Sequence, residues 1–316
     1  MSIPVRSQAR SCLRDRENAV TDYAFVTRCF MAGKLAGLSL LLGMLWLAPP
    51  PRVAGAEPTR PDVTVLSDLA YKAGDALTDY EKARCQLDLY LPQQATGFAT
   101  LVWFHGGALM EGGKNDEFNV RIARSLTQAG VAVALANYRL SPKAKYPSYV
   151  EDAAAAFAWV HAHIAERGGD PARVFVGGHS AGGYLTYMIG LDGRYLQAHG
   201  LETSAIAGLI PVSGQVMTHY TIREERGLKK DTIFADDAAP IHHLRKETPP
   251  FLILYAEHDM AARAEENQYL AAALKATGNP RVLPQLIKDR DHGSIAGNIA
   301  QPGDPAAQAI LAFMKP

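Results

Sequence analysis

The stretch Val-Phe-Val-Gly-Gly-His-Ser-Ala-Gly-Gly, at Val174–Gly183, decides the fold of this chain. Its first three residues are β-branched or aromatic, which predicts a short buried strand. Gly178–Gly182 then matches the pattern G-x-S-x-G around Ser180, and apolar residues at helical spacing follow it. A strand, a sharp turn and a helix are the context in which this pattern presents a nucleophilic serine. Because the pattern is common, the alternative is a glycine-rich turn that merely contains a serine.

Length and composition are those of an ordinary globular protein. The chain has 316 residues, no net formal charge, 48% hydrophobic residues and 20% charged residues. This composition is ordinary for a globular protein, and the chain is long enough for one large α/β domain. The balanced charge gives no electrostatic reason to expect nucleic acid as a partner. Cys12, Cys29 and Cys85 have neither the number nor the spacing of a disulfide framework or a zinc cluster.

The N-terminal region has the pattern of a secretory signal. Residues 35–48 form an apolar run of roughly 14 residues, which is short for a membrane span. Lys34 precedes the run, and prolines and small residues follow it up to Ala56. We expect a signal at 31–56, cleaved after Ala56, and an exported protein, periplasmic or secreted, without a stable membrane span. Residues 1–30 would be an upstream extension, although a start at Met1 or at Met31 stays open. The alternative reading of the apolar run is a buried core helix.

The rest of the chain alternates between strand and helix patterns. Apolar or alternating runs predict strands at 63–66, 85–91, 100–105, 131–138, 174–176, 206–212, 251–256 and 281–287. Further helices are predicted at 116–129, 149–166, 261–276 and 304–314. This alternation favours a mainly parallel central sheet with helices on both faces, in one domain at 57–316. Residues 213–248 are charged and weakly periodic, which fits either a small lid or a solvated connecting helix.

A nucleophilic serine needs a base and a group that orients the base. In sheets of this kind, functional groups gather beyond the carboxyl ends of the strands. His292 follows the last predicted strand, and Asp259 follows the strand at 251–256. We expect His292 to act as general base and then general acid, held by Asp259. Glu257 is the rival acid, with Asp289 and Asp291 as more distant ones.

Glycines after the strand at 100–105 predict an oxyanion hole. Without side chains, Gly106 and Gly107 let backbone N–H groups approach a developing oxyanion, and the N–H of Ala181 would complete the hole. A plain glycine turn at a strand end is the alternative. His105 is expected to brace this loop. His179 and Tyr184, on either side of the turn, are candidates for substrate binding, although Tyr184 could equally pack in the core.

Together these motifs resemble those of the α/β-hydrolase superfamily, in its hormone-sensitive-lipase-like and bacterial carboxylesterase group. The matching stretches are His105–Gly107 (the HGG motif), Tyr138–Pro142 with Tyr146-Pro147 and Glu151-Asp152 (YRLsP…fP…D), and Gly169–Arg173 ahead of the serine turn. The order Ser180, Asp259, His292 is also the order of this fold. The chain departs from this group in two respects: its N-terminal region is short, and no glycine stands shortly before Asp259. In both respects it is closer to small-capped relatives such as feruloyl and acetyl-xylan esterases and kynurenine formamidases.

The resemblance implies a serine esterase that works through an acyl-enzyme. Ser180, Asp259 and His292 would be its catalytic residues, and Gly106, Gly107 and Ala181 its oxyanion donors. The expected substrates are small-molecule or polysaccharide-linked esters with short acyl groups, and neither a metal nor an organic cofactor is implied. An arylformamidase or other amide hydrolase with the same residues is the alternative. A non-catalytic binding protein on this fold is a remote one, and the oligomeric state stays open.

Overall fold

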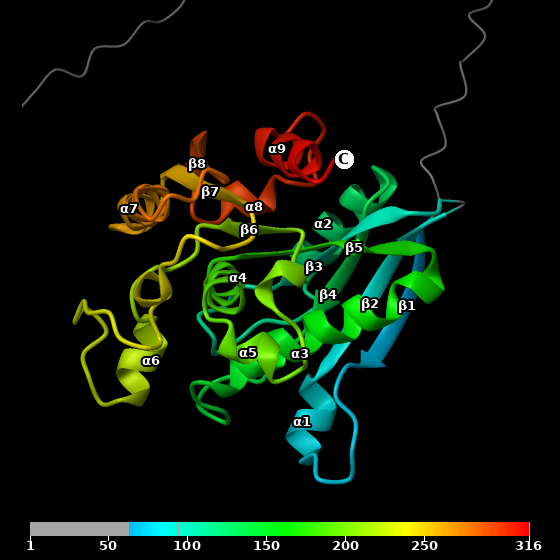
Figure 1. Cartoon of the computed structure of the whole chain (residues 1–316), viewed down its shortest axis with the longest axis horizontal. Coiled ribbons are helices and arrows are strands. Elements are labelled where there is room, and N and C mark those ends of the chain that lie inside the picture. Colours follow the sequence, from blue (N-terminus) through cyan, green and yellow to red (C-terminus); the bar gives the residue numbers. More distant parts are fainter. Residues whose placement is uncertain (1–62, 94, 316) are drawn as a thin grey trace, which may run out of the picture. The chain divides into compact units, whose positions relative to one another are not determined.

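The computed structural model describes residues 63–93 and 95–315. Its strands are β1 (Val63–Ala70), β2 (Gln86–Pro92), β3 (Phe98–Phe104), β4 (Ala132–Ala136), β5 (Gly169–His179), β6 (Gly208–Val212), β7 (Phe251–His258) and β8 (Val282–Asp291). They form one sheet in the order β1-β2-β4-β3-β5-β6-β7-β8 (Figure 1). The strand β2 is antiparallel to both of its neighbours, and all pairs from β4 to β8 are parallel. The predicted mainly parallel sheet is confirmed.

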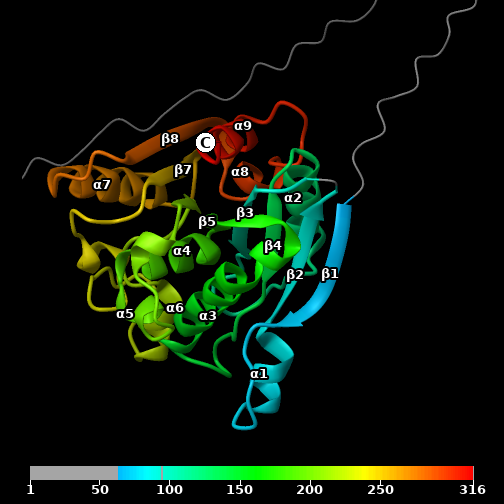
Figure 2. The ribbon, with the colours of Figure 1, turned by 45° about the vertical axis from the view of Figure 1, so that its right-hand side comes forward.

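Helices cover both faces of this sheet. They are α1 (Asp79–Arg84), α2 (Glu117–Gln128), α3 (Ser148–His163), α4 (Ala181–Leu191), α5 (Arg194–Gln197), α6 (Tyr220–Glu225), α7 (Arg263–Ala276), α8 (Ser294–Gly297) and α9 (Pro305–Phe313), with 3₁₀ turns at Ala165–Arg167, Thr203–Ala205 and Pro240–His243. One hydrophobic layer joins α3, α4 and α7 to the sheet, and a second joins α2, α8 and α9 to its other face (Figures 1 and 2).

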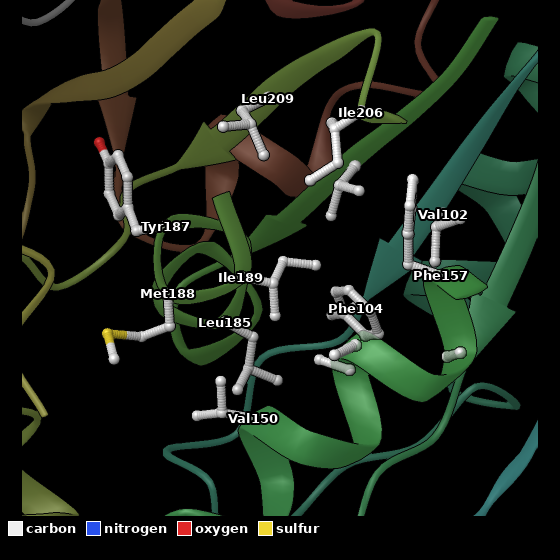
Figure 3. Close-up of a cluster of buried hydrophobic side chains, with 14 of the residues drawn as sticks. Val102, Phe104, Val150, Phe157, Leu185, Tyr187, Met188, Ile189, Ile206 and Leu209 are labelled. Carbon is white, nitrogen blue, oxygen red and sulfur yellow. The ribbon is translucent and has the colours of Figure 1, made fainter. Parts of the chain in front are cut away.

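The central strand β3 shows how the sequence builds both layers. All seven of its residues are buried, as predicted for a strand covered on both faces. Because successive side chains of a strand point to opposite faces, Phe104 joins the layer under α3 and α4, while Trp103 joins the layer under α2. Figure 3 shows the first layer, where side chains of α3, α4 and β3 meet. Burying each large side chain there, relative to leaving it exposed to water, adds roughly 1.5–3 kcal/mol to the free energy of unfolding.

Differences from the predicted elements concern mainly the first part of the sheet. The sequence analysis placed no helix between the strands at 63–66 and 85–91, yet α1 begins at Asp79. Thr78 caps it, because its hydroxyl accepts the N–H of Glu81 and the Glu81 carboxylate accepts the N–H of Thr78. The strand β1 also runs on to Ala70, beyond the predicted end at Leu66.

The predicted signal and upstream extension at 1–56 lie outside the described residues. Within the described part of the chain, none of the helices is both long and apolar enough to cross a membrane. The segment 213–248 contains α6 and the turn Pro240–His243 between β6 and β7. Thr221, Ile222 and Arg223 of α6 are buried, so this helix packs against the rest of the protein instead of lying free in solvent.

Candidate active site

The G-x-S-x-G stretch forms a strained turn between β5 and α4. Ser180 has φ 56° and ψ −112°, a conformation that residues with a side chain rarely adopt. Its N–H donates to the carbonyl of Val212 at 2.9 Å, which ties the turn to β6. The two flanking glycines are required by space. A Cβ on Gly182 would lie 2.0 Å from the carbonyl oxygen of Phe104, and one on Gly178 would lie 2.6 Å from the backbone of Gly182.

The structure brings together the three side chains that the sequence singled out. His292 lies just beyond β8 and Asp259 just beyond β7, so both reach the edge of the sheet where Ser180 projects. The Nε2 atom of His292 is 2.9 Å from Oγ of Ser180, and its Nδ1 atom is 2.6 Å from Oδ1 of Asp259. Because an ionised carboxylate only accepts hydrogen bonds, Nδ1 carries the proton and Nε2 is free to accept the serine hydroxyl.

Comparison with known proteins identifies the family of this chain. The family model described as BD-FAE matches residues 87–274, which is more than half of the chain. The chain belongs to the BD-FAE family. The resemblance drawn from the motifs is thereby confirmed at the level of the family.

Among curated proteins, this BD-FAE chain matches two from Mycobacterium tuberculosis (strain ATCC 25618 / H37Rv). It is 26% identical over 241 residues to the probable carboxylic ester hydrolase LipM, covering 69% of this chain and 55% of that protein. It is 28% identical over 233 residues to esterase LipC, covering 68% of this chain and 57% of that protein. The chain thus spans about half the length of the curated relatives it matches.

Solved structures establish the fold. A truncated form of a carbohydrate esterase from gut microbiota superposes with a TM-score of 0.63 at 20% identity, covering 81% of this chain and 98% of that one. Esterase 2 of Thermogutta terrifontis, phosphoramylated by tabun, superposes with a TM-score of 0.61 at 25% identity, covering 81% of this chain and 93% of that one. The BD-FAE chain therefore has the α/β-hydrolase fold.

The predicted oxyanion loop lies against the serine turn. A Cβ on Gly106 would be 3.4 Å from Cβ of Ser180, and one on Gly107, where φ is +102°, would be 2.2 Å from the carbonyl oxygen of Glu111. The positive φ and the 2.2 Å approach require glycine at position 107, while at position 106 the nearest atom, the carbonyl oxygen of His179, would be 3.3 Å from a Cβ and leaves little room for a side chain. Ala181 is the first residue of α4, where backbone N–H groups have no partner within the helix. The three predicted N–H donors thus belong to two segments that meet at Ser180.

Asp259 accepts hydrogen bonds from other groups besides His292. Its Oδ2 atom accepts the hydroxyl of Ser213 at 2.5 Å and the N–H of Ala256 at 3.3 Å, and its Oδ1 atom accepts the N–H of Met260 at 2.8 Å. Burial raises the pKa of Asp259, but the hydrogen bonds from His292, Ser213 and Met260 outweigh it and hold the pKa below its usual value. The carboxylate is therefore ionised at neutral pH.

Ser213 is a site residue that the sequence analysis missed. It is fully buried, has φ 51°, and its carbonyl accepts Nη1 of the buried Arg263 at 2.8 Å. A lone serine after a strand gives no pattern, and its partner Asp259 lies 46 positions further along the chain. The left-handed backbone and the arginine fix the hydroxyl in the direction of Asp259. We therefore expect Ser213 to restrain the carboxylate that orients His292.

Removing this hydroxyl is expected to lower kcat for ester hydrolysis by about 10-fold in Ser213→Ala, with KM nearly unchanged, because one hydrogen bond to a charged group is lost. Ser213→Gly is the matched variant, since it lacks the same hydroxyl but suits the left-handed backbone. Both variants should lose the same activity, while urea unfolding should find the glycine variant the more stable. Unequal losses of activity would contradict the assignment to the hydroxyl.

His105 and His179 brace the site as neutral side chains. The Nδ1–H of His105 donates to the carbonyl of Gly106 at 2.6 Å, and Nε2–H of His179 donates to the carbonyl of His292 at 2.6 Å. Burial lowers the pKa of His105 to about 4. Burial and the neighbouring His292 lower the pKa of His179 to about 3. His179, predicted as a substrate-binding residue, lines the cavity beside the oxyanion loop and also holds the loop of His292.

Tyr184 does not reach that cavity. Its side chain is fully buried, and its hydroxyl donates to the carbonyl of Ala238 at 2.9 Å. The structure thus places Tyr184 in the hydrophobic core, which is the alternative that the sequence left open, and its hydroxyl contacts the segment 213–248.

A pH dependence of stability follows from the buried histidines. They stay neutral in the fold but take up a proton below pH ~6.5 when unfolded, so the unfolded state binds more protons in this range. The free energy of unfolding should therefore be fully present above pH ~6.5 and should fall with decreasing pH, by about 3 kcal/mol for His105 by pH ~4. Urea unfolding across this range, compared with His105→Gln, checks it. The variant should show a flatter pH dependence; equal slopes would refute the assignment.

The cavity beside the oxyanion loop has a volume of about 510 Å³. It is lined by Gly106, Gly107, Glu111, Gly112, Asp116, Phe118, Asn119, His179 and Gly293. Its wall is therefore mixed, with a phenyl ring, an imidazole, two carboxylates, an amide and glycine backbone. Within residues 63–93 and 95–315, no three His, Cys, Asp or Glu side chains are grouped so that they could hold a metal ion.

Proposed function

We propose that this chain hydrolyses carboxylic esters through an acyl-enzyme formed on Ser180. The observation that carries the proposal is the pair of hydrogen bonds that links Asp259 to His292 at 2.6 Å and His292 to Ser180 at 2.9 Å. A serine hydroxyl is a weak nucleophile on its own, and this arrangement supplies both a base and a group that orients the base.

In the first half of the proposed reaction, Oγ of Ser180 attacks the ester carbonyl while Nε2 of His292 takes the hydroxyl proton. The ionised Asp259 stabilises the imidazolium that forms. When the tetrahedral intermediate collapses, the bond to the alcohol breaks and His292 gives the proton to the leaving oxygen. In the second half, His292 activates water, which attacks the acyl-enzyme and releases the carboxylic acid and Ser180.

The oxyanion that develops in both halves needs hydrogen-bond donors. The loop at Gly106 and Gly107 and the first turn of α4 at Ala181 offer backbone N–H groups beside Ser180. Such donors act on the transition state more than on the bound substrate, and each typically contributes about 10²–10³-fold to the rate. Because Gly106 and Gly107 carry no side chains, the space beside these N–H groups stays open to the oxyanion.

The names of the curated relatives support ester hydrolysis, and one solved relative is phosphoramylated by tabun. The moderate cavity and its mixed wall support small-molecule or polysaccharide-linked esters with short acyl groups. A panel of acetyl, butyryl, octanoyl and feruloyl esters, with N-formylkynurenine as the amide counterpart, tests this proposal. We expect acetyl and butyryl esters to be preferred. Faster turnover of N-formylkynurenine than of every ester would instead favour the arylformamidase alternative.

We also propose that the protein is exported through a signal at 31–56, a segment whose apolar run and small-residue end support this role. Expression of the whole chain in a bacterial host, followed by fractionation and N-terminal sequencing, tests it. The expected result is a mature protein outside the cytoplasm that begins at Glu57. A cytoplasmic protein that keeps residues 31–56 would refute the proposal.

A further inference from the structure

The oxyanion loop continues into a backbone that needs external support. Gly107 and Gly112 have φ +102° and +93°, and between them Ala108 and Leu109 have φ 59° and 63°. Glycine adopts such angles freely, but residues with a side chain do so only where their surroundings enforce it. The conformation of Ala108 and Leu109 therefore depends on contacts from outside the loop.

Leu109 and Ala108 are held in different ways. The Leu109 side chain is fully buried, and its carbonyl accepts the N–H of Ser141 at 2.8 Å. Ala108 has only a methyl group, too small to fix the backbone by packing. Its carbonyl instead accepts the hydroxyl of Thr221, on α6, at 2.5 Å. Thr221 is 2% exposed, so water hardly competes for this hydrogen bond.

The helix α6 is itself firmly attached. Its Glu225 carboxylate accepts the N–H of Tyr146 at 3.0 Å and the hydroxyl of Tyr149 at 3.3 Å. Within the segment 213–248, the side chain of the buried Arg223 donates to the carbonyls of Thr218 at 2.7 Å and Lys230 at 3.0 Å, which fixes α6 to the chain on either side of it. Thr221 therefore projects from a fixed support, which allows its hydroxyl to restrain the loop.

We propose that Thr221 is a positioning residue for the oxyanion hole, and this inference rests on the ester hydrolysis proposed above. By holding the carbonyl of Ala108, the segment 213–248 keeps the loop in the left-handed turn that aims the N–H groups of Gly106 and Gly107 at Ser180. The turn is closed on its other side by the carbonyl of Gly107, which accepts the N–H of Met110 and of Glu111, both at 2.9 Å. The segment thus takes part in transition-state stabilisation without touching the substrate.

The test removes the hydroxyl and measures kcat and KM separately, with p-nitrophenyl acetate as substrate. Thr221→Val keeps the branched shape, and we expect it to lower kcat by about 10-fold while KM changes by less than about twofold, because the hole acts mainly on the transition state. Thr221→Ala cannot clash with its neighbours and should lose a similar factor. Thr221→Ser restores the hydroxyl and should recover most of the activity.

A trifluoromethyl ketone that forms a tetrahedral adduct with serine gives an independent readout. Its affinity should fall by the same factor as kcat in Thr221→Val, since both depend on the oxyanion hole. Thr127→Val is the matched control, because Thr127 is also a buried helical threonine but its hydroxyl has no partner among the described residues. This control should leave kcat and inhibitor affinity unchanged.

Outcomes that overturn the two proposals differ. If the parent protein hydrolyses esters but Thr221→Val and Thr221→Ala keep the parental kcat, or if Thr221→Ser stays as slow as they are, the role of Thr221 is refuted and ester hydrolysis is not. If all Thr221 variants have a lower kcat, a higher KM and a lower free energy of unfolding together, the residue is merely structural and the inference is refuted. A folded parent protein without any ester hydrolysis refutes both proposals.

Discussion

Replacing Ser180 with alanine is expected to lower kcat for ester hydrolysis by roughly 10⁴–10⁶-fold, the loss seen when the nucleophile of a serine hydrolase is removed. No other group can take its place, because Oγ of Ser180 is the atom that His292 Nε2 contacts at 2.9 Å. The residual rate would come from the oxyanion donors and from substrate binding alone. The variant should fold, because alanine keeps the backbone bond from residue 180 to the carbonyl of Val212.

Two measurements check this expectation. Steady-state hydrolysis of p-nitrophenyl acetate gives the loss of kcat, and a fluorophosphonate probe should label the parent protein but not Ser180→Ala. Ser204→Ala is a suitable control, because Ser204 is an exposed residue in the turn Thr203–Ala205 and should leave rate and labelling unchanged. Equal labelling of Ser180→Ala and the parent protein would place the nucleophile elsewhere and would refute the proposed mechanism.

The serine turn and its partners were predictable because each leaves a local signal. Steric contacts at Gly178 and Gly182 exclude any Cβ, so only glycine fits there and the turn is visible in the sequence. His292 and Asp259 each follow a strand of the parallel part of the sheet, and the carboxyl ends of such strands meet at one edge. Their positions after predicted strands therefore indicated that Ser180 and His292, 112 positions apart, would converge.

Other parts of the site left no such signal. Ser213 and Thr221 act through single hydroxyl groups, and their partners, Asp259 and Ala108, are 46 and 113 positions away. A hydroxyl that binds one distant acceptor imposes no periodicity and no spacing on the sequence. The role of Tyr184 was ambiguous for a related reason. Every residue of α4 is buried, so the helical pattern does not tell which face meets the cavity and which meets the core.

The fold shows the same division. The buried strands of the parallel part were predicted because runs of apolar residues bounded by helices have few other interpretations. The helix α1 was missed although Thr78 and Glu81 form a capping box, since its six residues carry no apolar face and none of them is buried. Its position depends on distant partners such as Leu140, whose N–H donates to the hydroxyl of Tyr80 at 2.9 Å.

Asp259→Asn is expected to lower kcat by about 10⁴-fold, which is the second large effect. Asp259 accepts four hydrogen bonds, from Nδ1 of His292, the hydroxyl of Ser213 and the N–H groups of Ala256 and Met260. An amide has only one oxygen, so one side of the substituted group must present NH₂. The imidazole can exchange its donor for an acceptor, so we expect the oxygen to face Ser213 and the NH₂ group to face Nδ1. His292 would then carry its proton on Nε2 and could no longer accept the proton of Ser180.

The matched control for this change is Glu257→Gln, the rival acid at the end of the same strand. The Glu257 carboxylate is exposed and accepts the N–H of Asp289 at 2.9 Å, away from His292, so its variant should stay within about twofold of the parent rate. Steady-state kinetics with both variants, each checked by urea unfolding, separates loss of the correctly oriented base from loss of the fold. A folded Asp259→Asn variant with parental kcat would show that His292 is oriented by something else. An equally large loss of activity in Glu257→Gln would contradict the assignment of the acid, because Asp259, and not Glu257, contacts Nδ1 of His292.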